Sequence, residues 1–321
     1  MIDLIGAPFD LTGRRPGTRL GPAALRLAGL RQALEALDQS VVDHGDVQAA
    51  VEAEPAEGMK AFAEWAAALS PVKQRAAESL RSDRLPLVLG GDHSMSVASV
   101  GAALEVFGDD IALLWIDAHA DLHTPCTTIT GNPHGMPIAA LMGVPSIDPG
   151  EAGRQWARLL AEVVPPQRLD PHHMAWFGLR ELDPPEQARM AELGPGYTAT
   201  MYEIDRHGIV SCLQRLDHWL TACGARHLWI SFDVDALDPI LAPGTGTTVR
   251  GGLTYREAHL VAEMLRELLD KPGCPYRLVG VDLMEVNPLY DSSNETAITT
   301  VEWLASLFGK TILGRRHYRT V

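Results

Sequence analysis

The sequence predicts an α/β fold with a parallel sheet, and three features of the 321-residue chain support this. Short runs of continuously apolar residues recur along the chain, as is typical of strands that are covered on both faces. Between them lie longer stretches with apolar residues three and four positions apart, which is the spacing of amphipathic helices. Strands that alternate with helices indicate parallel pairing through right-handed crossovers. No linker or repeat divides the chain, so we expect a single domain over residues 1–321.

Seven apolar runs are the predicted strands, and a short run near the C-terminus is an eighth candidate. In chain order they lie at residues 2–10, 41–47, 85–91, 111–117, 174–180, 227–233 and 277–283, followed by KTILG at 310–314. Two segments that contain Pro and Gly, 51–58 and 143–153, are predicted to be surface loops.

Three longer stretches carry helix signals, at residues 21–37, 70–82 and 254–271. In the second stretch Ser70 stands before Pro71, so we expect Ser70 to cap the start of that helix. In the third stretch Thr254 is followed three residues later by Glu257, which is the pattern of a capping box.

The composition argues against several classes of partner. The net charge is -14, from 41 acidic residues against 27 Lys and Arg, which is unfavourable for binding nucleic acid or an anionic membrane. No apolar run approaches the roughly 20 residues that a membrane span needs, and we expect no secretory signal. The four cysteines form no CxxC pair, so we expect a cytoplasmic protein with free thiols.

Acidic residues and histidines gather where four predicted strands end. The motifs are LGGDHS (Asp92, His93), WIDAHAD (Asp117, His119, Asp121), SFDVDALDP (Asp233, Asp235, Asp238) and GVDLMEVNP (Asp282, Glu285). Sites in parallel sheets form beyond the carboxyl ends of the strands. Residues two apart in an extended backbone project to one side, so we expect Asp117, His119 and Asp121 to point together, and likewise Asp233 and Asp235.

Several carboxylates in one place repel each other unless a cation lies among them. Four carboxylates and two imidazoles suit a pair of divalent ions, best manganese, although zinc, cobalt or nickel stay open. Such a pair, about 3.5–4 Å apart, can convert a bridging water to hydroxide near neutral pH. A single Asp at a strand end is more often a turn or cap residue, and Asp238 before Pro239 keeps that interpretation.

These motifs resemble the three metal motifs of the ureohydrolases, the superfamily of arginases and agmatinases. The segments GAPFD, HTPCTTITGNPHGMP, FGLRELDPPE and APGTGTTVRGGLTYREA are similar to arginase segments as well, so that the resemblance covers nearly the whole chain. It implies a three-layer α/β/α sandwich with a mostly parallel eight-stranded sheet. It also implies a homo-oligomer, a trimer or hexamer.

The resemblance implies hydrolysis of the guanidino group of L-arginine to L-ornithine and urea by a hydroxide that bridges two Mn²⁺ ions per chain. One ion would be held by His93, Asp117, Asp121 and Asp233, and the other by His119, Asp117, Asp233 and Asp235. Asp121 would also take up the proton of the hydroxide. Glu285 would hold the guanidinium, and His134 would protonate the leaving amine.

The resemblance also assigns the ends of the substrate. The loop residues His123, Thr128, Thr130 and Asn132 would bind the α-carboxylate, while Asp183 and Glu186 would bind the α-ammonium. Agmatinases lack this loop pattern, which favours an α-amino acid as the substrate. Thr247 matches an active-site position, with a turn threonine as the plain alternative.

Three departures keep the exact substrate open. Arginases usually have Asn at the position of His123, Ser at that of Thr130 and Gln at that of Met136. The alternatives are a modified arginine such as N-omega-hydroxy-L-arginine or another guanidino acid, and agmatine is less favoured. A zinc deacetylase and a non-catalytic binding protein are competing hypotheses. We expect Cys126 to be a packing residue and residues 314–320 to be a basic tail or a subunit contact.

Overall fold

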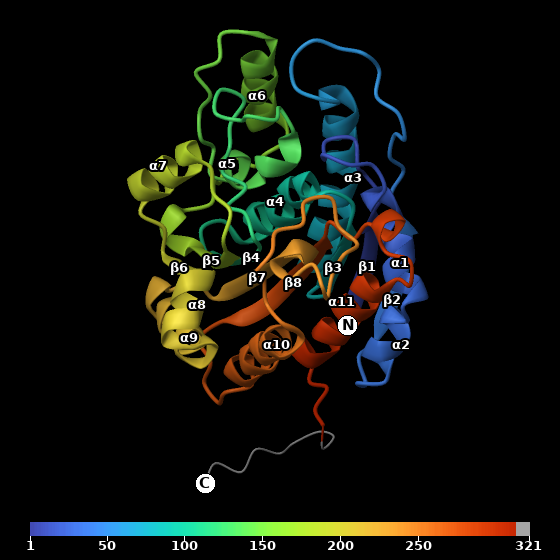
Figure 1. The fold of residues 1–321 in the computed structure, drawn as a ribbon, viewed down its shortest axis with the longest axis vertical. Coiled ribbons are helices and arrows are strands. Elements are labelled where there is room, and N and C mark those ends of the chain that lie inside the picture. Colours follow the sequence, from blue (N-terminus) through green and yellow to red (C-terminus); the bar gives the residue numbers. More distant parts are fainter. Residues whose placement is uncertain (313–321) are drawn as a thin grey trace.

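A computed structural model describes residues 1–312, in which eight parallel strands form one sheet (Figure 1). The strand order is β2-β1-β3-β8-β7-β4-β5-β6. The strands are β1 (Ile2–Ala7), β2 (Val41–Asp46), β3 (Leu85–Gly90), β4 (Ile111–Ile116), β5 (Met174–Leu179), β6 (Tyr197–Thr200), β7 (His227–Asp233) and β8 (Arg277–Met284). The parallel α/β fold and the eight-stranded sheet are therefore confirmed.

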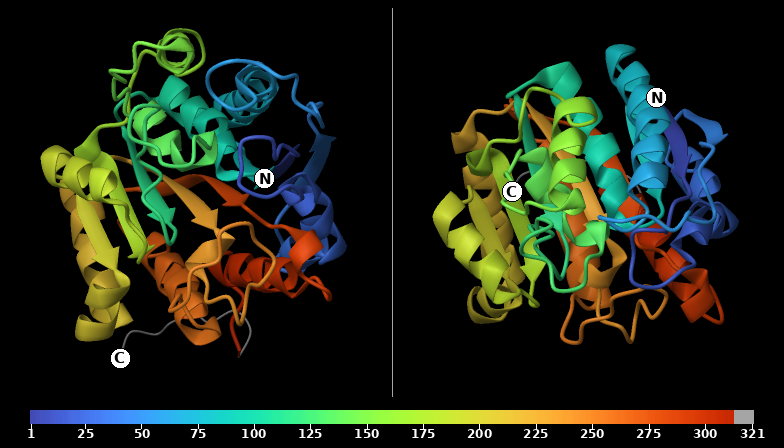
Figure 2. Two further views of the ribbon diagram at one scale, coloured as in Figure 1. Left: turned by 45° about the horizontal axis from the view of Figure 1, so that its top comes forward. Right: turned by 90° about the horizontal axis from the view of Figure 1, so that it is seen from above.

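Helices cover both faces of the sheet and complete the three-layer architecture (Figures 1 and 2). On one face lie α3 (Phe62–Arg81), α4 (Ser96–Phe107), α5 (Pro137–Leu141), α6 (Glu151–Glu162) and α7 (Pro184–Leu193). On the other face lie α1 (Gly21–Leu27), α2 (Leu30–Glu35), α8 (Met201–His207), α9 (Ile209–Cys223), α10 (Tyr255–Leu269) and α11 (Glu295–Leu307). Within residues 1–312, no helix has the length and apolar character that crossing a membrane requires.

The central strand β4 shows why the apolar runs are continuous. Its residues are all buried, and they alternate between the two hydrophobic cores. Leu113 and Trp115 pack under α3 and α4, whereas Leu114 and Ile116 pack against the opposite helix layer. Because both faces are covered, no position of this strand is left for a polar residue.

Two predicted helices have different bounds in the structure. The predicted cap at Ser70 is wrong, because α3 begins at Phe62 and runs through Pro71. Burial of the face that carries Trp65 and Leu69 outweighs the hydrogen bond that Pro71 cannot donate. The predicted helix at 21–37 is split by Gly29, whose φ of 84° ends α1 and starts α2. The capping box of Thr254 and Glu257 is confirmed at the start of α10.

The eighth strand is not the predicted one. Residues 310–312 form no strand, and the remainder of KTILG, like the segment 314–320, lies outside the described residues. The eighth strand is β6 at the edge of the sheet, beside β5. The predicted loop at 143–153 ends in the first residues of α6. All four cysteines are free, and Cys126 is exposed rather than packed as predicted.

Candidate metal and active site

The acidic and histidine motifs converge because the strands that precede them are neighbours. The central order β3-β8-β7-β4 brings four carboxyl ends together at one edge of the sheet. His93 follows β3, Asp117 follows β4, Asp233 ends β7, and Glu285 follows β8. The sequence predicted this convergence from the parallel topology.

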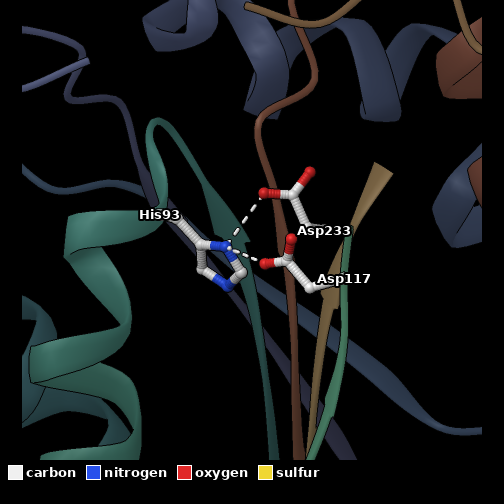
Figure 3. A group of neighbouring side chains, drawn as sticks. All are labelled: His93, Asp117 and Asp233. Carbon is white, nitrogen blue, oxygen red and sulfur yellow. Dashed lines mark ion pairs between the residues drawn. The ribbon is translucent and has the colours of Figure 1, made fainter. Parts of the chain in front are cut away.

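A first group of candidate ligands surrounds one imidazole nitrogen (Figure 3). His93 Nδ1 lies 3.0 Å from Asp117 Oδ2, 2.9 Å from Asp233 Oδ2 and 3.2 Å from Asp121 Oδ2. The opposite ring nitrogen, His93 Nε2, lies 3.0 Å from Ser231 Oγ, so Nδ1 is the nitrogen that faces the carboxylates.

A second group shares Asp117 with the first. His119 Nδ1 lies 3.4 Å from Asp117 Oδ1 and 3.1 Å from Asp235 Oδ2. The hydroxyl of Thr247 donates to Asp235 Oδ2 at 2.9 Å, so this threonine orients a carboxylate of the second group. Asp117 thus lies between two sets of possible metal ligands.

The orientation of the side chains fits cations better than it fits hydrogen bonds within the cluster. His93 Nδ1 and Asp117 Oδ2 are fully buried, yet neither has a hydrogen bond of acceptable geometry to another described residue. Buried polar atoms without partners are costly. Ligand atoms of His93, Asp117 and Asp233 instead lie within 4.8 Å of one another, and a mixture of imidazole nitrogen and carboxylate oxygen suits divalent metal ions.

The electrostatics of the cluster lead to the same conclusion. Burial, followed by the charge of Asp117, raises the pKa of Asp121 well above its usual range. Burial, followed by the charge of Asp235, does the same to the pKa of Asp233. Burial alone would lower the pKa of His93, but the carboxylates of Asp117 and Asp233, close to its Nδ1, raise that pKa well above the usual value. The cluster therefore favours added positive charge, which protons or divalent cations can supply.

The extended projection predicted for the ligands after β4 is wrong for Asp121. The strand ends at Ile116, and Asp121 has a φ of 52° in the left-handed region. Glu285, directly after β8, has a φ of 64°. Asp121 nevertheless reaches His93, because the chain turns back toward the sheet rather than continuing away from it.

Glu285, which is buried, and His134, which is partly buried, form a pair beside the candidate ligands. Glu285 Oε1 accepts hydrogen bonds from His134 Nδ1 and from the backbone N–H of His93, both at 2.9 Å. Burial alone would lower the pKa of His134, but the bond and charge of Glu285 raise it above the usual value. Burial would raise the pKa of Glu285, and the bond from His134 lowers it instead. An imidazolium–carboxylate pair is therefore favoured.

A cavity of about 390 Å³ opens from this cluster to the surface. Most of the predicted substrate contacts line it: His123, Thr130, Asn132, Asp183, Glu186 and Thr247. Thr128 is not a lining residue, and its hydroxyl accepts from the N–H of Gly131 at 3.0 Å. His123 Nε2 lies 3.2 Å from Asp183 Oδ2 and 3.6 Å from Glu186 Oε2.

Two strand-end acids lie outside both candidate ligand groups and have structural partners. Asp238 forms the predicted turn, because its carboxylate accepts the N–H groups of Ile240 and Gly251 at 3.0 and 2.8 Å. Asp282 is fully buried and accepts bonds from Ser99, Trp229 and Ser231. Through Ser231, Asp282 supports the orientation of His93.

Sequence reasoning missed three arginines near the site. Arg14 and Arg15 line the cavity. The guanidinium of Arg180 donates to the carbonyl groups of Asp235, Ala236 and Leu237, which follow β7. The only sequence signal was their position, after the first predicted strand for Arg14 and Arg15 and at the end of the fifth for Arg180, at the carboxyl edge of the sheet.

The chain is similar to arginases over almost all of its length. The model of the Arginase family matches residues 1–309. An arginase of Staphylococcus aureus (strain COL) is 36% identical over 317 residues, which cover 97% of this chain and 98% of the relative. An arginase of Agrobacterium fabrum is 38% identical over 322 residues, which cover 97% and 92%. The crystal structure of arginase from Bacillus subtilis matches with a TM-score of 0.83 at 34% identity, and covers 97% of this chain and 99% of that one.

Proposed function

Because the chain belongs to the arginase family, we propose that it hydrolyses the guanidino group of L-arginine to L-ornithine and urea. The observation that carries this proposal is the convergence of two His–carboxylate groups at the buried end of one cavity. Glu285 and His134 lie at the same end of the cavity, so groups for binding a guanidinium and for moving a proton adjoin the metal ligands.

We propose that the two groups hold two Mn²⁺ ions. His93, Asp117, Asp121 and Asp233 would hold the first, and His119, Asp117, Asp233 and Asp235 the second. When bound, paired divalent cations would lower the pKa of water, so that hydroxide would be available as a nucleophile near neutral pH. The short distances within both groups and the unpartnered Nδ1 of His93 support this assignment.

The remaining steps depend on side chains of the chain itself. Asp121, whose Oδ2 lies 3.2 Å from His93 Nδ1 within the first group, would accept a proton from the attacking water. The carboxylate of Glu285 would bind the substrate guanidinium through charge-assisted hydrogen bonds. His134 donates from Nδ1 to Glu285, so its Nε2 proton is the one available for the leaving amine. Asp121 would thus take the proton of the attacking water, and His134 would supply the proton of the leaving amine.

The outer part of the cavity would bind the amino-acid end of the substrate. His123, Thr130 and Asn132 are the proposed contacts for the α-carboxylate, with Thr128 shaping their loop. Asp183 and Glu186 are the proposed contacts for the α-ammonium. A cytoplasmic location, a single domain and a trimeric or hexameric assembly stay predictions from the sequence and the family.

Turnover by protein loaded with Mn²⁺ tests the proposal. Urea and ornithine are measured with L-arginine, N-omega-hydroxy-L-arginine and agmatine as substrates, and metal content is measured by elemental analysis. We expect L-arginine to be the best substrate and two manganese ions per chain. One zinc per chain with no urea would favour the deacetylase hypothesis. Faster turnover of agmatine than of L-arginine would overturn the inference that the loop after β4 indicates an α-amino acid as the substrate.

A matched pair of variants tests the role of the ligands. Asp121→Asn should abolish most turnover, because it removes a ligand and proton acceptor. Asp270→Asn, an exposed acid at the end of α10, should leave turnover unchanged. Equal activity in Asp121→Asn and wild type would favour the binding-protein hypothesis.

A further inference from the structure

The charges that line the cavity are unevenly distributed. The buried end is acidic, with Asp121, Asp233 and Asp235 among the lining residues, and Glu181 and Asp183 add further carboxylates. Among the described residues that line the cavity, Arg14 and Arg15 are the only lysine or arginine side chains. Both are exposed, so they belong to its outer part.

These two guanidinium groups have no anionic partner in the part of the chain that the structure describes. Neither forms an ion pair or a hydrogen bond with another residue among 1–312, although the chain has 41 acidic residues. Nearby Arg19, in contrast, pairs with Asp10 at 2.9 Å. The guanidinium carbon of Arg15 lies 4.9 Å from the ring centre of Tyr290. This contact restricts the orientation of the Arg15 side chain and leaves its N–H groups free to donate to a ligand.

The loop that carries the two arginines is fixed on both sides. Before them, the N–H of Thr12 donates to Asp92 at 3.1 Å. After them, the N–H of Gly17 donates to Asp10 at 2.6 Å, and Asn287 Nδ2 donates to the carbonyl of Pro16 at 3.1 Å. The loop backbone is therefore held in place before a ligand binds, which lowers the ordering cost of any contact that the arginines make.

A lysine also connects this loop to the proposed carboxylate loop. Lys60 Nζ donates to the carbonyl of Gly13 at 2.5 Å and lies 3.4 Å from Asn132 Oδ1. Arg14 and Arg15 are thus attached to the same end of the cavity as Asn132 and Thr130. Those two residues offer hydrogen bonds but no positive charge, whereas a carboxylate is bound most strongly by a guanidinium.

We propose that Arg14 and Arg15 bind the carboxylate of the substrate and select guanidino acids over guanidino amines. This inference rests on the proposed function and specifies its substrate class. A zwitterionic substrate fits the charge distribution in one direction only, with its guanidinium at the acidic end and its carboxylate at the two arginines. Agmatine has a guanidinium but no carboxylate, so it gains nothing from them.

Binding of the two product amines separates this contact from catalysis. Isothermal titration of Mn²⁺-loaded protein compares L-ornithine with putrescine, which lacks the carboxylate. Arg14→Ala and Arg15→Ala should each weaken ornithine binding about fivefold, the upper end for an exposed ion pair, and the double variant should weaken it further. Putrescine binding should not weaken, and Arg14→Lys should recover part of the loss. In kinetics, KM for arginine should rise more than kcat falls.

Arg215→Ala is the matched control, because it removes an equal charge from an exposed position on α9, away from the cavity. An unchanged ratio of ornithine to putrescine affinity in the double variant would overturn the inference, as would an equal effect of Arg215→Ala. These results differ from failure of the proposed function, in which wild-type protein releases no urea from arginine. Wild-type protein that binds ornithine no better than putrescine would also overturn the inference.

Discussion

Replacing Arg180 by Met should loosen the backbone that carries Asp235. The Arg180 guanidinium donates to the carbonyl groups of Asp235, Ala236 and Leu237, which continue from β7. It also donates to Val249 at 2.9 Å, in the loop that carries Thr247. One half-buried side chain therefore holds together two segments of the site, and Met is similar in length but donates no hydrogen bond.

The expected loss follows from the bonds removed. A hydrogen bond from a charged donor contributes about 1.5–3 kcal/mol. Counting only the bonds to Asp235 and Val249, and allowing for water that replaces part of them, we expect a loss of about 3–4 kcal/mol in the free energy of unfolding. Because Asp235 is a proposed metal ligand, we also expect Mn²⁺ binding to weaken about tenfold, as is usual when support of a ligand is lost.

Urea unfolding of metal-free protein and titration with Mn²⁺ measure the two effects separately. Arg168→Met is the matched control, because Arg168 also donates to backbone carbonyls, those of Leu160 and Pro165, at a distance from the site. The control should lower stability and leave Mn²⁺ affinity unchanged. A loss below about 1 kcal/mol in Arg180→Met, or equal weakening of Mn²⁺ binding by the control, would refute this reasoning.

Three further predictions concern the same region. Gly252→Ala should lower stability by about 1–3 kcal/mol in thermal unfolding, because the new Cβ would lie 2.6 Å from Arg180 Nη2 and 2.5 Å from the carbonyl carbon of Leu237; wild-type stability would show that the backbone yields freely. The N–H of Ile240, then those of two glycines, hold the pKa of Asp238 below its usual value. Its contribution is therefore present above about pH 4 and is lost as the pH falls through the folded pKa. Asp238→Asn should thus lose less stability than wild type in acid, by at most about 1 kcal/mol, and identical acid profiles would contradict this. Chelation should lower the melting temperature and Mn²⁺ should restore it, because binding to the folded state alone stabilises it; insensitivity to both would contradict a metal site.

The fold was largely predictable because most strands are buried on both faces. A strand such as β4 leaves a continuous apolar run that the sequence displays directly. Strand β6 was missed because its sequence, YTAT, is short and partly exposed at the edge of the sheet, so it has no such run. The start of α3 was missed for another reason: Pro71 suggests a helix start locally, and only tertiary packing overrides it.

The candidate ligands were predictable because their motifs follow adjacent strands and because those motifs resemble a known family. Residues that donate hydrogen bonds to backbone carbonyl groups were not predictable from the sequence. Arg180 donates to groups that every residue possesses, so no sequence pattern marks its partners. In the sequence, Arg14 and Arg15 are indistinguishable from ordinary surface residues. Only the structure places them in a cavity that is also lined by acidic residues. Contacts of this kind depend on the tertiary structure and leave no periodic signal.

The backbone at Asp121 and Glu285 is in the left-handed region, so the site contains strained backbone at two of its acidic residues. Residues other than glycine rarely adopt such a φ, and the strain amounts to about 1–3 kcal/mol at a position held there by its surroundings. A chain selected for stability alone would favour Gly at both positions. Both instead carry carboxylates that face the cluster, so the strain accompanies side chains that the proposed chemistry needs.

A Gly–Ala comparison at position 121 isolates this strain. Both substitutions remove the carboxylate, but only Ala keeps the Cβ that disfavours the left-handed region. We expect metal-free Asp121→Gly to be more stable than Asp121→Ala by about 1 kcal/mol in urea unfolding, the reverse of the order in an ordinary helix. The pair Gln74→Ala and Gln74→Gly, at an exposed position within α3, provides that ordinary reference. If Ala were as stable as Gly at position 121, the strain would be absent, and the left-handed turn would not be the feature that carries Asp121 to His93.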